Sequence, residues 1–433
     1  DMLLETDCRE LGEVMVSARQ ERAGTMTRID LKSLHLVPGT TGSVESILKT
    51  LPGVSSSNEL SSQYSVRGGN FDENLVYVND IEIHRPFLIR SGQQEGLSFI
   101  NSDLVSSIKF SAGGFEARYG DRMSSVLDIS YKKPESTAGS FTASLMGGSL
   151  HFEGINRNRK LTYLTGIRFK TTSYLLNSLD TEGEYKPNFF DFQSLFTYSI
   201  AKDLELSFLG NISRNRYNFI PRTRRTDFGT ASIPLNLVIY FEGNEADVFN
   251  IIQGAVSLKY EPSKKLTLKF ISSGFNSVET ERYDILGEYL INELDNTIGS
   301  ETYGDSILNI GIGGFLNHAR NYLDASVFSA SHIGEYNSGR HSVRWGVKFQ
   351  NNWISDKLSE WEMIDSAGYS LPQDPDQVLV NYLIKAQNEV TNTIFSGYFQ
   401  DTWRFRDGSS VYYITTGIRS TYLGLNKQLL LSP

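Results

Sequence analysis

From about residue 140 to its end, the sequence alternates apolar and polar residues with a period of two, in one run after another. In the run 341–350, Val343, Trp345 and Val347 alternate with polar residues that include Arg344 and Lys348. Because successive side chains of a β-strand point to opposite faces, each run predicts a strand with one apolar and one polar face. Ten strands are predicted, near 141–150, 160–170, 192–200, 204–213, 254–261, 265–276, 321–335, 341–352, 393–405 and 410–424.

Short and long connections alternate between these strands. Connections longer than about 15 residues are uncommon in compact soluble domains. Short turns at one rim and long loops at the other are typical of an outer-membrane β-barrel, and strands of about 9–11 residues fit a tilted crossing of the bilayer. We therefore expect an antiparallel transmembrane β-barrel, with a soluble two-domain β protein that binds carbohydrate as an alternative. The joins at 151–159, 200–204, 261–264, 336–340 and 406–409 are short, and those at 171–191, 214–253, 277–320 and 353–392 are long and polar.

Composition excludes several other classes of protein. No run approaches the roughly 18 consecutive apolar residues of a transmembrane helix. The formal net charge of −9 argues against nucleic acid as a partner. Cys8 is the only cysteine, so we expect neither a disulfide framework nor a CxxC metal site. The first residues, DMLLETDCRE, have no basic or apolar signal region, so we expect a signal peptide to be absent or already removed.

Residues 20–133 show a different pattern, in which short helical and strand signals are separated by dense turns. The stretch 40–54 predicts a short helix that Pro52 and Gly53 bring to an end. We expect a compact α+β domain. Its short strands are predicted at 74–83, 104–113 and 124–132.

Five pieces of this domain carry a family resemblance: LKTLPGV (48–54), SVRGGN (65–70), NLVYVNDIEI (74–83), INSDLVSSIKFSAGGFEARYG (100–120) and SSVLDIS (124–130). In these pieces and their order, residues 44–131 resemble the plug domain of a TonB-dependent outer-membrane receptor. The family's usual Asp-Gly turn is here Asn79-Asp80, which keeps the turn chemistry. The plug motif comprises Pro52, Gly53, Arg67, Gly68, Gly69, Asp80, Gly113, Gly114, Tyr119 and Gly120.

The resemblance implies a plug inside a barrel of about 22 strands. Since an open ten-stranded half-barrel would expose its edges to lipid, we expect the chain to be part of a longer protein. Gly68 and Gly69 allow positive φ and close backbone approach. Arg67 is expected to be buried, and the resemblance implies a glutamate of the barrel wall as its partner. The expected division is a periplasmic segment at 1–19, the plug at 20–133 and the first part of the barrel at 134–433.

The segment GEVMVSA at 12–18 precedes the plug, where the family carries its TonB box. A short β-prone segment can add as a strand to the sheet of the periplasmic protein TonB, which ExbB and ExbD energise. The alternative is an ordinary linker strand that closes a preceding domain. The candidate residues are Glu13, Val14, Met15, Val16, Ser17 and Ala18.

Three stretches are candidates for contact with a solute. By the resemblance, the plug loops 68–74 and 84–96 reach the substrate cavity; the alternative is that they only pack against the barrel. The basic stretch 213–227 can bind an anionic solute through guanidinium groups, or else meets lipopolysaccharide phosphates or water. The acidic stretch 277–308 lacks the ligand spacing of a calcium loop and is expected to be a solvated surface. The candidate residues are Asn70, Phe71, His84, Arg85, Phe87, Arg90, Arg214, Arg216, Arg222, Arg224 and Arg225.

No catalytic pattern is present. The six histidines form no HxH or HExxH spacing, and there is no GxSxG sequence. We therefore expect a protein that is not an enzyme and that has no cofactor and no metal.

The function predicted from these observations is TonB-dependent import of a solute across the outer membrane of a Gram-negative bacterium. Siderophores, cobalamin, peptides and glycans are all possible solutes, because fold alone does not select a substrate. The alternative is a structural or docking barrel in a cell-surface complex, without transport. The expected partners are TonB with ExbB and ExbD, outer-membrane lipid and lipopolysaccharide, an anionic solute and a surface lipoprotein.

Overall fold

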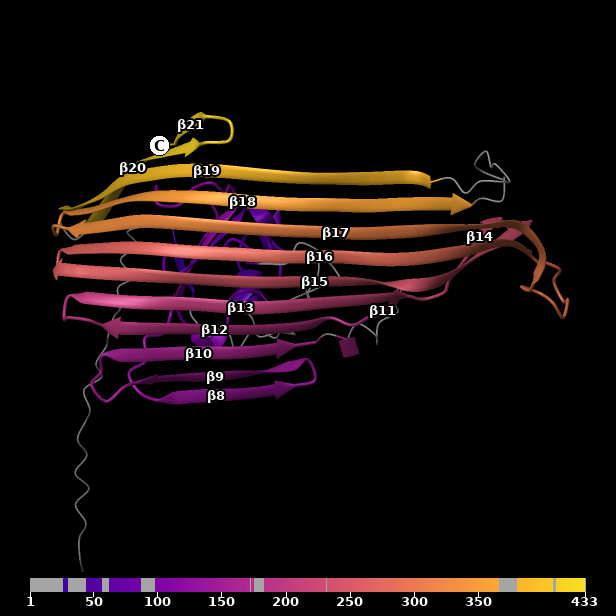
Figure 1. Cartoon of the computed structure of the whole chain (residues 1–433), viewed down its shortest axis with the longest axis horizontal. Coiled ribbons are helices and arrows are strands. Elements are labelled where there is room, and N and C mark those ends of the chain that lie inside the picture. Colours follow the sequence, from indigo (N-terminus) through magenta and orange to yellow (C-terminus); the bar gives the residue numbers. More distant parts are fainter. Residues whose placement is uncertain are drawn as a thin grey trace, which may run out of the picture.

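The chain folds into a small N-terminal domain and a large antiparallel sheet (Figure 1). In this computed structural model, no helix among the described residues is long and apolar enough to cross a membrane. The candidate TonB-box residues lie outside the described residues, and so do the solute-binding candidates Phe87 and Arg90. The structure describes residues 26–29, 44–56, 62–86, 98–171, 173–174, 183–230, 232–365, 380–407 and 410–432.

The N-terminal domain is built on a five-stranded sheet in the order β1-β6-β7-β4-β5. β4 and β7 are parallel, whereas the other neighbouring strands are antiparallel. The helix α1 packs on this sheet through Val44 and Leu48, which are fully buried with Ile108 and Leu127. The predicted α+β domain is confirmed. Its elements are β1 Thr27–Ile29, α1 Val44–Leu48, β2 Val54–Ser55, β3 Ser65–Val66, β4 Asn74–Val78, β5 Ile81–Glu82, β6 Val105–Ser111 and β7 Ser125–Tyr131, with 3-10 turns at Phe71–Glu73 and Ser102–Leu104.

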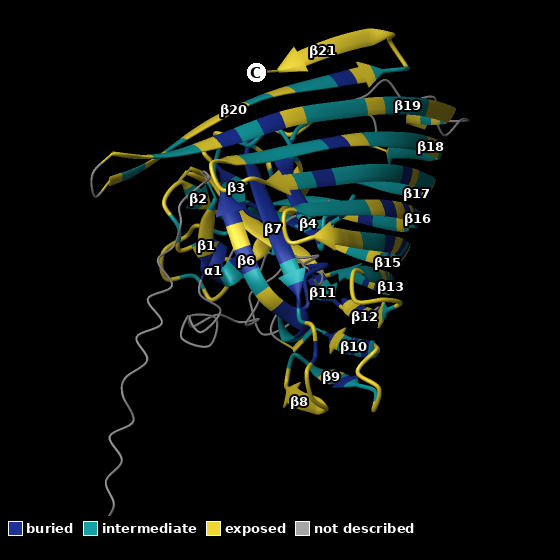
Figure 2. Cartoon of the chain, turned by 90° about the vertical axis from the view of Figure 1, so that its left-hand side faces the viewer, coloured by how far each residue is buried: buried dark blue, intermediate teal, exposed yellow. Residues whose placement is uncertain are grey.

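The large sheet, which we call the wall, has 14 strands. Its main path runs antiparallel from β8 to β21 in chain order, with β11 on β13 and β14 on β15. The wall curves around the N-terminal domain (Figure 2). Its strands are β8 Ala138–Ser144, β9 Gly147–Ile155, β10 Leu161–Lys170, β11 Gly183–Tyr185, β12 Asn188–Ser199, β13 Leu204–Pro221, β14 Arg224–Thr230, β15 Ile233–Ser263, β16 Leu266–Leu294, β17 Ser306–Asn337, β18 His341–Asp365, β19 Val380–Asp407, β20 Ser410–Leu423 and β21 Gln428–Ser432.

The two rims of the wall differ. At the short-turn rim, β15 joins β16 through 264–265 and β17 joins β18 through 338–340. At the opposite, long-strand rim, β15, β16 and β17 extend furthest (Figure 1). These strands have 31, 29 and 32 residues, roughly three times the length that a tilted strand needs to cross a bilayer.

The outer face of the wall is apolar and its inner face is polar, which confirms the predicted alternation. On β16, the Phe270 side chain is 52% exposed on the outer face, whereas Lys269 reaches the N-terminal domain. On β18, Val347 is 60% exposed, whereas Lys348 bonds to Glu82 of the N-terminal domain. The polar residues of each strand therefore line the interior and contact the domain that the wall surrounds.

The predicted strand at 141–150 is wrong. The chain turns at 145–146, so that β8 and β9 form a hairpin in which Ser144 pairs with Gly147. Gly147 has φ +131° and lies so close to the backbone of β10 that a side chain there would overlap the Phe169 carbonyl. A glycine that permits this close approach turns one continuous alternating run into two strands.

The predicted long loops are also largely wrong, because most of 214–253, 277–320 and 353–365 is strand. β15 and β16 remain paired from Ser263↔Leu266 to Leu235↔Glu293. The polar composition of these stretches indicated residues outside a bilayer. It does not require loops, because a sheet that stands in water can be polar on both faces and still keep its ladder of hydrogen bonds.

Candidate functional site

The turn after β3 explains the Arg-Gly-Gly sequence. Arg67 and Gly68 have φ of 50° and 82°, in the left-handed region that glycine adopts without strain. Gly69 has no positive φ, but a side chain there would overlap the Ser124 hydroxyl and lie 2.9 Å from its Cβ. Ser124 donates a hydrogen bond to Glu73 (2.6 Å). Gly69 therefore permits the turn to pack directly on the start of β7.

Arg67 is exposed, contrary to the prediction of a buried arginine. Its backbone N–H donates to the Gly53 carbonyl (2.8 Å), and its guanidinium lies over Gly113, where it would be 3.1 Å from a Cβ. No carboxylate among the described residues forms an ion pair with it.

The remaining residues of the motif shape the edge of the domain that meets the wall. Gly113 and Gly114 have φ of 110° and 67°. A side chain at Gly120 would overlap the Arg419 guanidinium of β20. The Tyr119 hydroxyl donates to Asp128 inside the domain (2.8 Å).

The hairpin between β4 and β5 carries the strongest contacts with the wall. Asn79 and Asp80 have φ of 52° and 68°, as a two-residue type I′ turn requires. The Asp80 carboxylate accepts hydrogen bonds from Arg118 (2.8 Å) and from Lys269 of β16 (2.9 Å). Burial by itself would raise the pKa of Asp80, but Lys269 and Arg118 outweigh it and hold this pKa well below its usual range. Asp80 is therefore charged and fixed to the wall.

The return strand β5 is held at Glu82. Its carboxylate pairs with Lys348 of β18, and its carbonyl accepts from the Gln253 amide of β15 (3.0 Å). Burial would raise the pKa of Glu82, but Lys348 and then His84 lower it to about 2. Three neighbouring regions of the wall thus hold this one hairpin.

Among the described residues, the charged contacts of the interface have both polarities, and four of them place the cation on the wall and the carboxylate on the N-terminal domain. The opposite polarity, which the family resemblance implied, occurs in the pairs Arg85–Glu279, Lys132–Glu153 (3.8 Å) and Lys133–Glu205. The wall-to-domain pairs are Lys269–Asp80 (2.9 Å), Arg344–Glu116 (3.1 Å), Arg419–Asp121 (2.7 Å) and Lys348–Glu82.

A cavity of about 250 Å³ lies between the N-terminal domain and the wall, just beyond β5. Asp80 meets β16 at Lys269, near the short-turn rim, whereas Arg85 meets it at Glu279, further along the strand. The cavity therefore lies on the side of the domain that faces the long-strand rim. Its lining is Phe71, Asp72, Asn74, Leu75, Glu82, Ile83, His84, Arg85, Pro86, Arg122, Phe275, Ser277 and Ala325.

Two side chains give the cavity its polar character. The His84 ring packs on Phe275, with 5.5 Å between ring centroids, and burial lowers the pKa of His84. The Arg85 guanidinium pairs with Glu279 and lies 5.6 Å from the centre of the Phe249 ring. Burial lowers the pKa of Arg85 to about 10, so this arginine remains charged at neutral pH. The site thus offers a neutral imidazole and a cation beside aromatic rings.

The structure brings three of the predicted solute-binding residues together, namely Phe71, His84 and Arg85. Asn70 lies next to them and caps the turn Phe71–Glu73, where its side chain accepts from the Phe71 N–H (2.9 Å). The lining also contains Arg122, which sequence reasoning did not select. Only its place before β7, two residues after the motif glycine Gly120, could have suggested it.

The basic stretch lies elsewhere. Arg214 and Arg216 are exposed on β13, where they alternate with the buried residues Asn215 and Tyr217 and therefore project from the outer face. Arg222 is 3.5 Å from Glu184, and Arg224 and Arg225 lie on the exposed strand β14. None of these five arginines lines the cavity described above.

Three carboxylates on the inner face of the wall form a group that could accept a cation. Oxygens of Glu245, Asp247 and Glu281 lie within 4.8 Å of one another. Asn321 donates to Glu281 (3.1 Å), and all three acids make further contacts within the chain. Sequence reasoning placed Glu281 in a solvated loop and missed this group, because the strand register that joins β15 to β16 was not foreseen.

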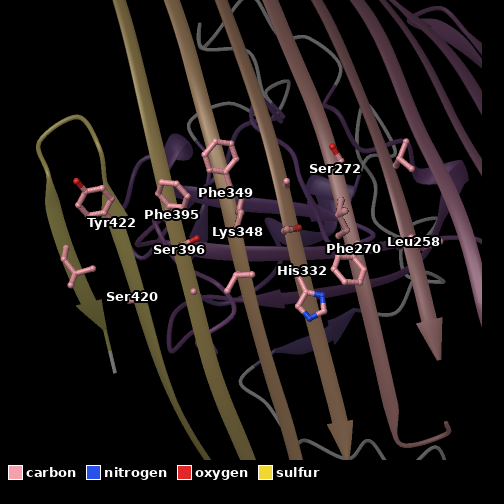
Figure 3. A pocket seen from close by; sticks show the side chains of 17 residues that line it. Leu258, Phe270, Ser272, His332, Lys348, Phe349, Phe395, Ser396, Ser420 and Tyr422 are labelled. Carbon is pink, nitrogen blue, oxygen red and sulfur yellow. The ribbon is translucent and has the colours of Figure 1, made fainter. Parts of the chain in front are cut away.

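A groove of about 770 Å³ runs across the outer face of the wall over β15 to β21. Figure 3 shows aromatic side chains such as Phe349, Phe395 and Tyr422 beside the smaller Ser272 and Ser420. The rings of Phe270 and His332 stack with 4.5 Å between their centroids. This surface belongs to the apolar outer face.

Comparison with known proteins identifies the N-terminal domain. Residues 19–127 match the family model of the TonB-dependent receptor plug domain. No curated protein sequence matches the chain.

Two solved structures resemble the whole fold. The RagAB peptide importer in its "closed-closed" state is 9% identical with a TM-score of 0.54, over 95% of this chain and 56% of that one. The siderophore receptor PiuA from Acinetobacter baumannii is 11% identical with a TM-score of 0.51, over 93% of this chain and 58% of that one. The chain thus spans little more than half the length of either structure.

Proposed function

We propose that this chain, a TonB-dependent outer-membrane receptor by its plug domain and its antiparallel wall, takes part in active import of a solute across the outer membrane. The N-terminal domain is the plug, and the wall is the first part of the barrel. The proposed division is 1–19, 20–133 and 134–433. The short-turn rim faces the periplasm and the long-strand rim faces the exterior, as is usual for outer-membrane barrels.

The cavity beside Phe71, His84 and Arg85 is the observation that carries this proposal. It lies between the plug and the barrel wall, on the side that the long-strand rim surrounds. A solute bound there contacts both parts, so its release is coupled to a movement of the plug. Because Arg85 keeps its charge, the site favours a solute with an anionic group.

The plug contacts suggest how pulling by TonB opens a path. In this proposal TonB, energised by ExbB and ExbD, binds Glu13–Ala18 and pulls on the plug. Movement requires the pairs Asp80–Lys269 and Glu82–Lys348 to separate. Since both sides of this interface are polar, water can replace each lost hydrogen bond, which keeps the separation reversible.

Native mass spectrometry of the complete protein, purified in mild detergent from its own host, tests the proposal. We expect a bound small molecule that is lost in Arg85→Ala and in Phe71→Ala, since the second substitution removes contact area without changing charge. Arg214→Ala is the matched control, because it removes an exposed arginine from the outer face. A stoichiometric protein partner with no solute would instead support a docking barrel without transport.

A further inference from the structure

Strand β17 extends beyond its neighbour on one side. Among the described residues, the pairing of β17 with β18 reaches Gly314↔Asp365, whereas its pairing with β16 continues to Ser306↔Leu294. Within the described part of the chain, residues 306–313 therefore have a strand partner on one side only. Figure 1 shows β17 running past the end of β18 at the long-strand rim. This edge lies in the middle of the wall and does not depend on where the sheet begins or ends.

Of the features with which proteins usually protect an exposed strand, this edge has two register shifts in its pairing with β16, at Ile291/Asn292 and Glu293/Leu294, but neither charged residues nor proline. The sequence 306–313, SILNIGIG, has no charge and no proline. Ile307, Leu308, Ile310 and Ile312 are 59%, 55%, 38% and 54% exposed. These four side chains make this length of the strand apolar and exposed.

The edge also stands clear of the lipid. Residue 310 lies 27 residues from the short-turn end of β17 at Asn337, which is roughly 90 Å along a strand. A tilted strand crosses the bilayer in about 9–11 residues. With the orientation proposed above, these apolar side chains meet water outside the cell, where the hydrophobic effect favours covering them.

The surroundings of the edge are acidic. Residues 286–313 contain no lysine or arginine. The connection that leads into β17 carries Asp295, Glu301 and Asp305, and Glu293 lies at the end of β16. The Asp295 carboxylate accepts from the Thr302 hydroxyl (2.7 Å) and the Thr297 N–H (2.9 Å), which keeps it ionised at the surface.

We propose that the edge of β17 at Ser306–Gly313 is a docking site for an extended segment of a second protein. The segment adds a β-strand to the wall through backbone hydrogen bonds. It presents apolar side chains to the exposed isoleucines and leucine, and basic residues at its ends face the acidic connection. The contact is extracellular and separate from the plug cavity.

Hydrogen exchange of the complete receptor in mild detergent tests this site. The probe is a synthetic twelve-residue peptide of alternating threonine and valine or isoleucine with two lysines at each end. A peptide with glutamates in place of the lysines is its counterpart. We expect the lysine peptide to slow exchange of those amides of 307–313 that do not bond to β16 about tenfold, with weaker protection at high salt, and the glutamate peptide to have little effect.

Two variants distinguish strand addition from non-specific adsorption of the peptide. Ile310→Pro removes a backbone N–H and Ile310→Lys introduces charge repulsion with the lysine peptide, so both should abolish protection. Leu425→Lys is the matched control, since Leu425 is 66% exposed in the turn between β20 and β21, outside this edge and outside the acidic connection. Heat-modifiable gel mobility verifies that each variant is folded.

The proposal is overturned if the amides of 307–313 that do not bond to β16 are already protected in the receptor alone, because the chain would then cover its own edge. Equal protection by both peptides, or protection that survives Ile310→Pro, would also overturn it. A Val14→Pro receptor that has lost import should bind the peptide normally. Failure of import and failure of this docking site are therefore distinguishable.

Discussion

Glu82 keeps its charge inside the plug–barrel interface because Lys348 lies against it. Without that lysine, burial would favour the protonated carboxyl; with it, the pKa falls to about 2. Asp80 is shifted in the same direction by Lys269 and Arg118. The two carboxylates of one hairpin thus make the attachment of the plug dependent on pH.

The direction of this pH dependence follows from the lowered pKa of Glu82. The pKa of Glu82 is lower in the folded protein than the roughly 4.3 of an unfolded chain, so ionised Glu82 stabilises the fold fully above that pH. The contribution, on the order of 3 kcal/mol, is lost as the pH falls from about 4 towards 2. Denaturant unfolding of the complete protein and of Glu82→Gln should therefore differ at pH 7 and converge near pH 2. A difference that does not change with pH would contradict this assignment.

For the ion pairs between plug and wall, sequence alone predicts the partner that lies on the wall. The alternation places Lys269, Arg344 and Lys348 on the polar face of their strands, as the structure confirms. Their partners Asp80 and Glu82 could not be predicted, because they lie far away in the sequence and meet the wall only through the packing of the whole plug. Arg67 is exposed where burial was expected, and the wall glutamate implied by the family resemblance stays a prediction, because the chain spans 56% and 58% of the two structures that it resembles.

At the scale of elements, the turn at 67–70 is held by two different properties of glycine. Gly68 has a positive φ with open space around it, so Gly68→Ala should cost about 1–2 kcal/mol of backbone strain. Gly69→Ala should cost more, because its Cβ would overlap Ser124. Ser124→Gly should restore part of the stability of Gly69→Ala and none of that of Gly68→Ala. Denaturant unfolding measures all four variants, and equal costs at both glycines would refute the packing argument.

The segment 12–18 is proposed to act as a strand that TonB takes up. Val14→Pro removes a backbone donor that strand pairing needs. We expect this variant to abolish energy-dependent uptake of the solute identified by mass spectrometry, while solute binding to the purified receptor is unchanged. Val14→Thr, which keeps the N–H and the β preference, is the control. Normal uptake by the proline variant would remove Glu13–Ala18 from consideration as the TonB box.

A strand is predictable from sequence where the apolar–polar alternation continues without interruption over the whole length of the strand. The run 341–352 falls on β18 because its alternation has no interruption. The run 141–150 is split into β8 and β9 because Gly147 and Gly148 permit a turn within an alternating pattern. The tall parts of β15, β16 and β17 were taken for loops, because polar residues interrupt the alternation within these stretches, as Glu242, Asn244 and Glu245 do in β15.

At the scale of the whole molecule, the plug and its surrounding wall follow from sequence, whereas the solute does not. The order of five short motifs predicts the plug, and the match over residues 19–127 supports it. The full barrel of about 22 strands remains a prediction, because the chain spans 56% and 58% of the two structures that it resembles. The cavity beside Arg85 depends on contacts between the plug and the wall, which no local pattern encodes.

The central claim is that the plug must move within the barrel for import. Ala117 of the plug faces β20 so closely that a Cβ at Gly417 would be 2.8 Å from the Ala117 Cβ. A disulfide holds its Cβ atoms about 3.8 Å apart, so Ala117→Cys and Gly417→Cys come within bonding reach once these two backbones shift apart by about 1 Å, and the bond then ties the two parts together. The single variants, and the native Cys8 replaced by serine, are the controls.

Uptake of the identified solute in energised cells that carry this double variant is the most direct measurement. We predict no uptake while the disulfide is oxidised, unchanged binding of the solute, and full recovery of uptake after reduction. Uptake at the normal rate through the oxidised receptor would show that import proceeds with this edge of the plug fixed to the barrel, and would contradict the account.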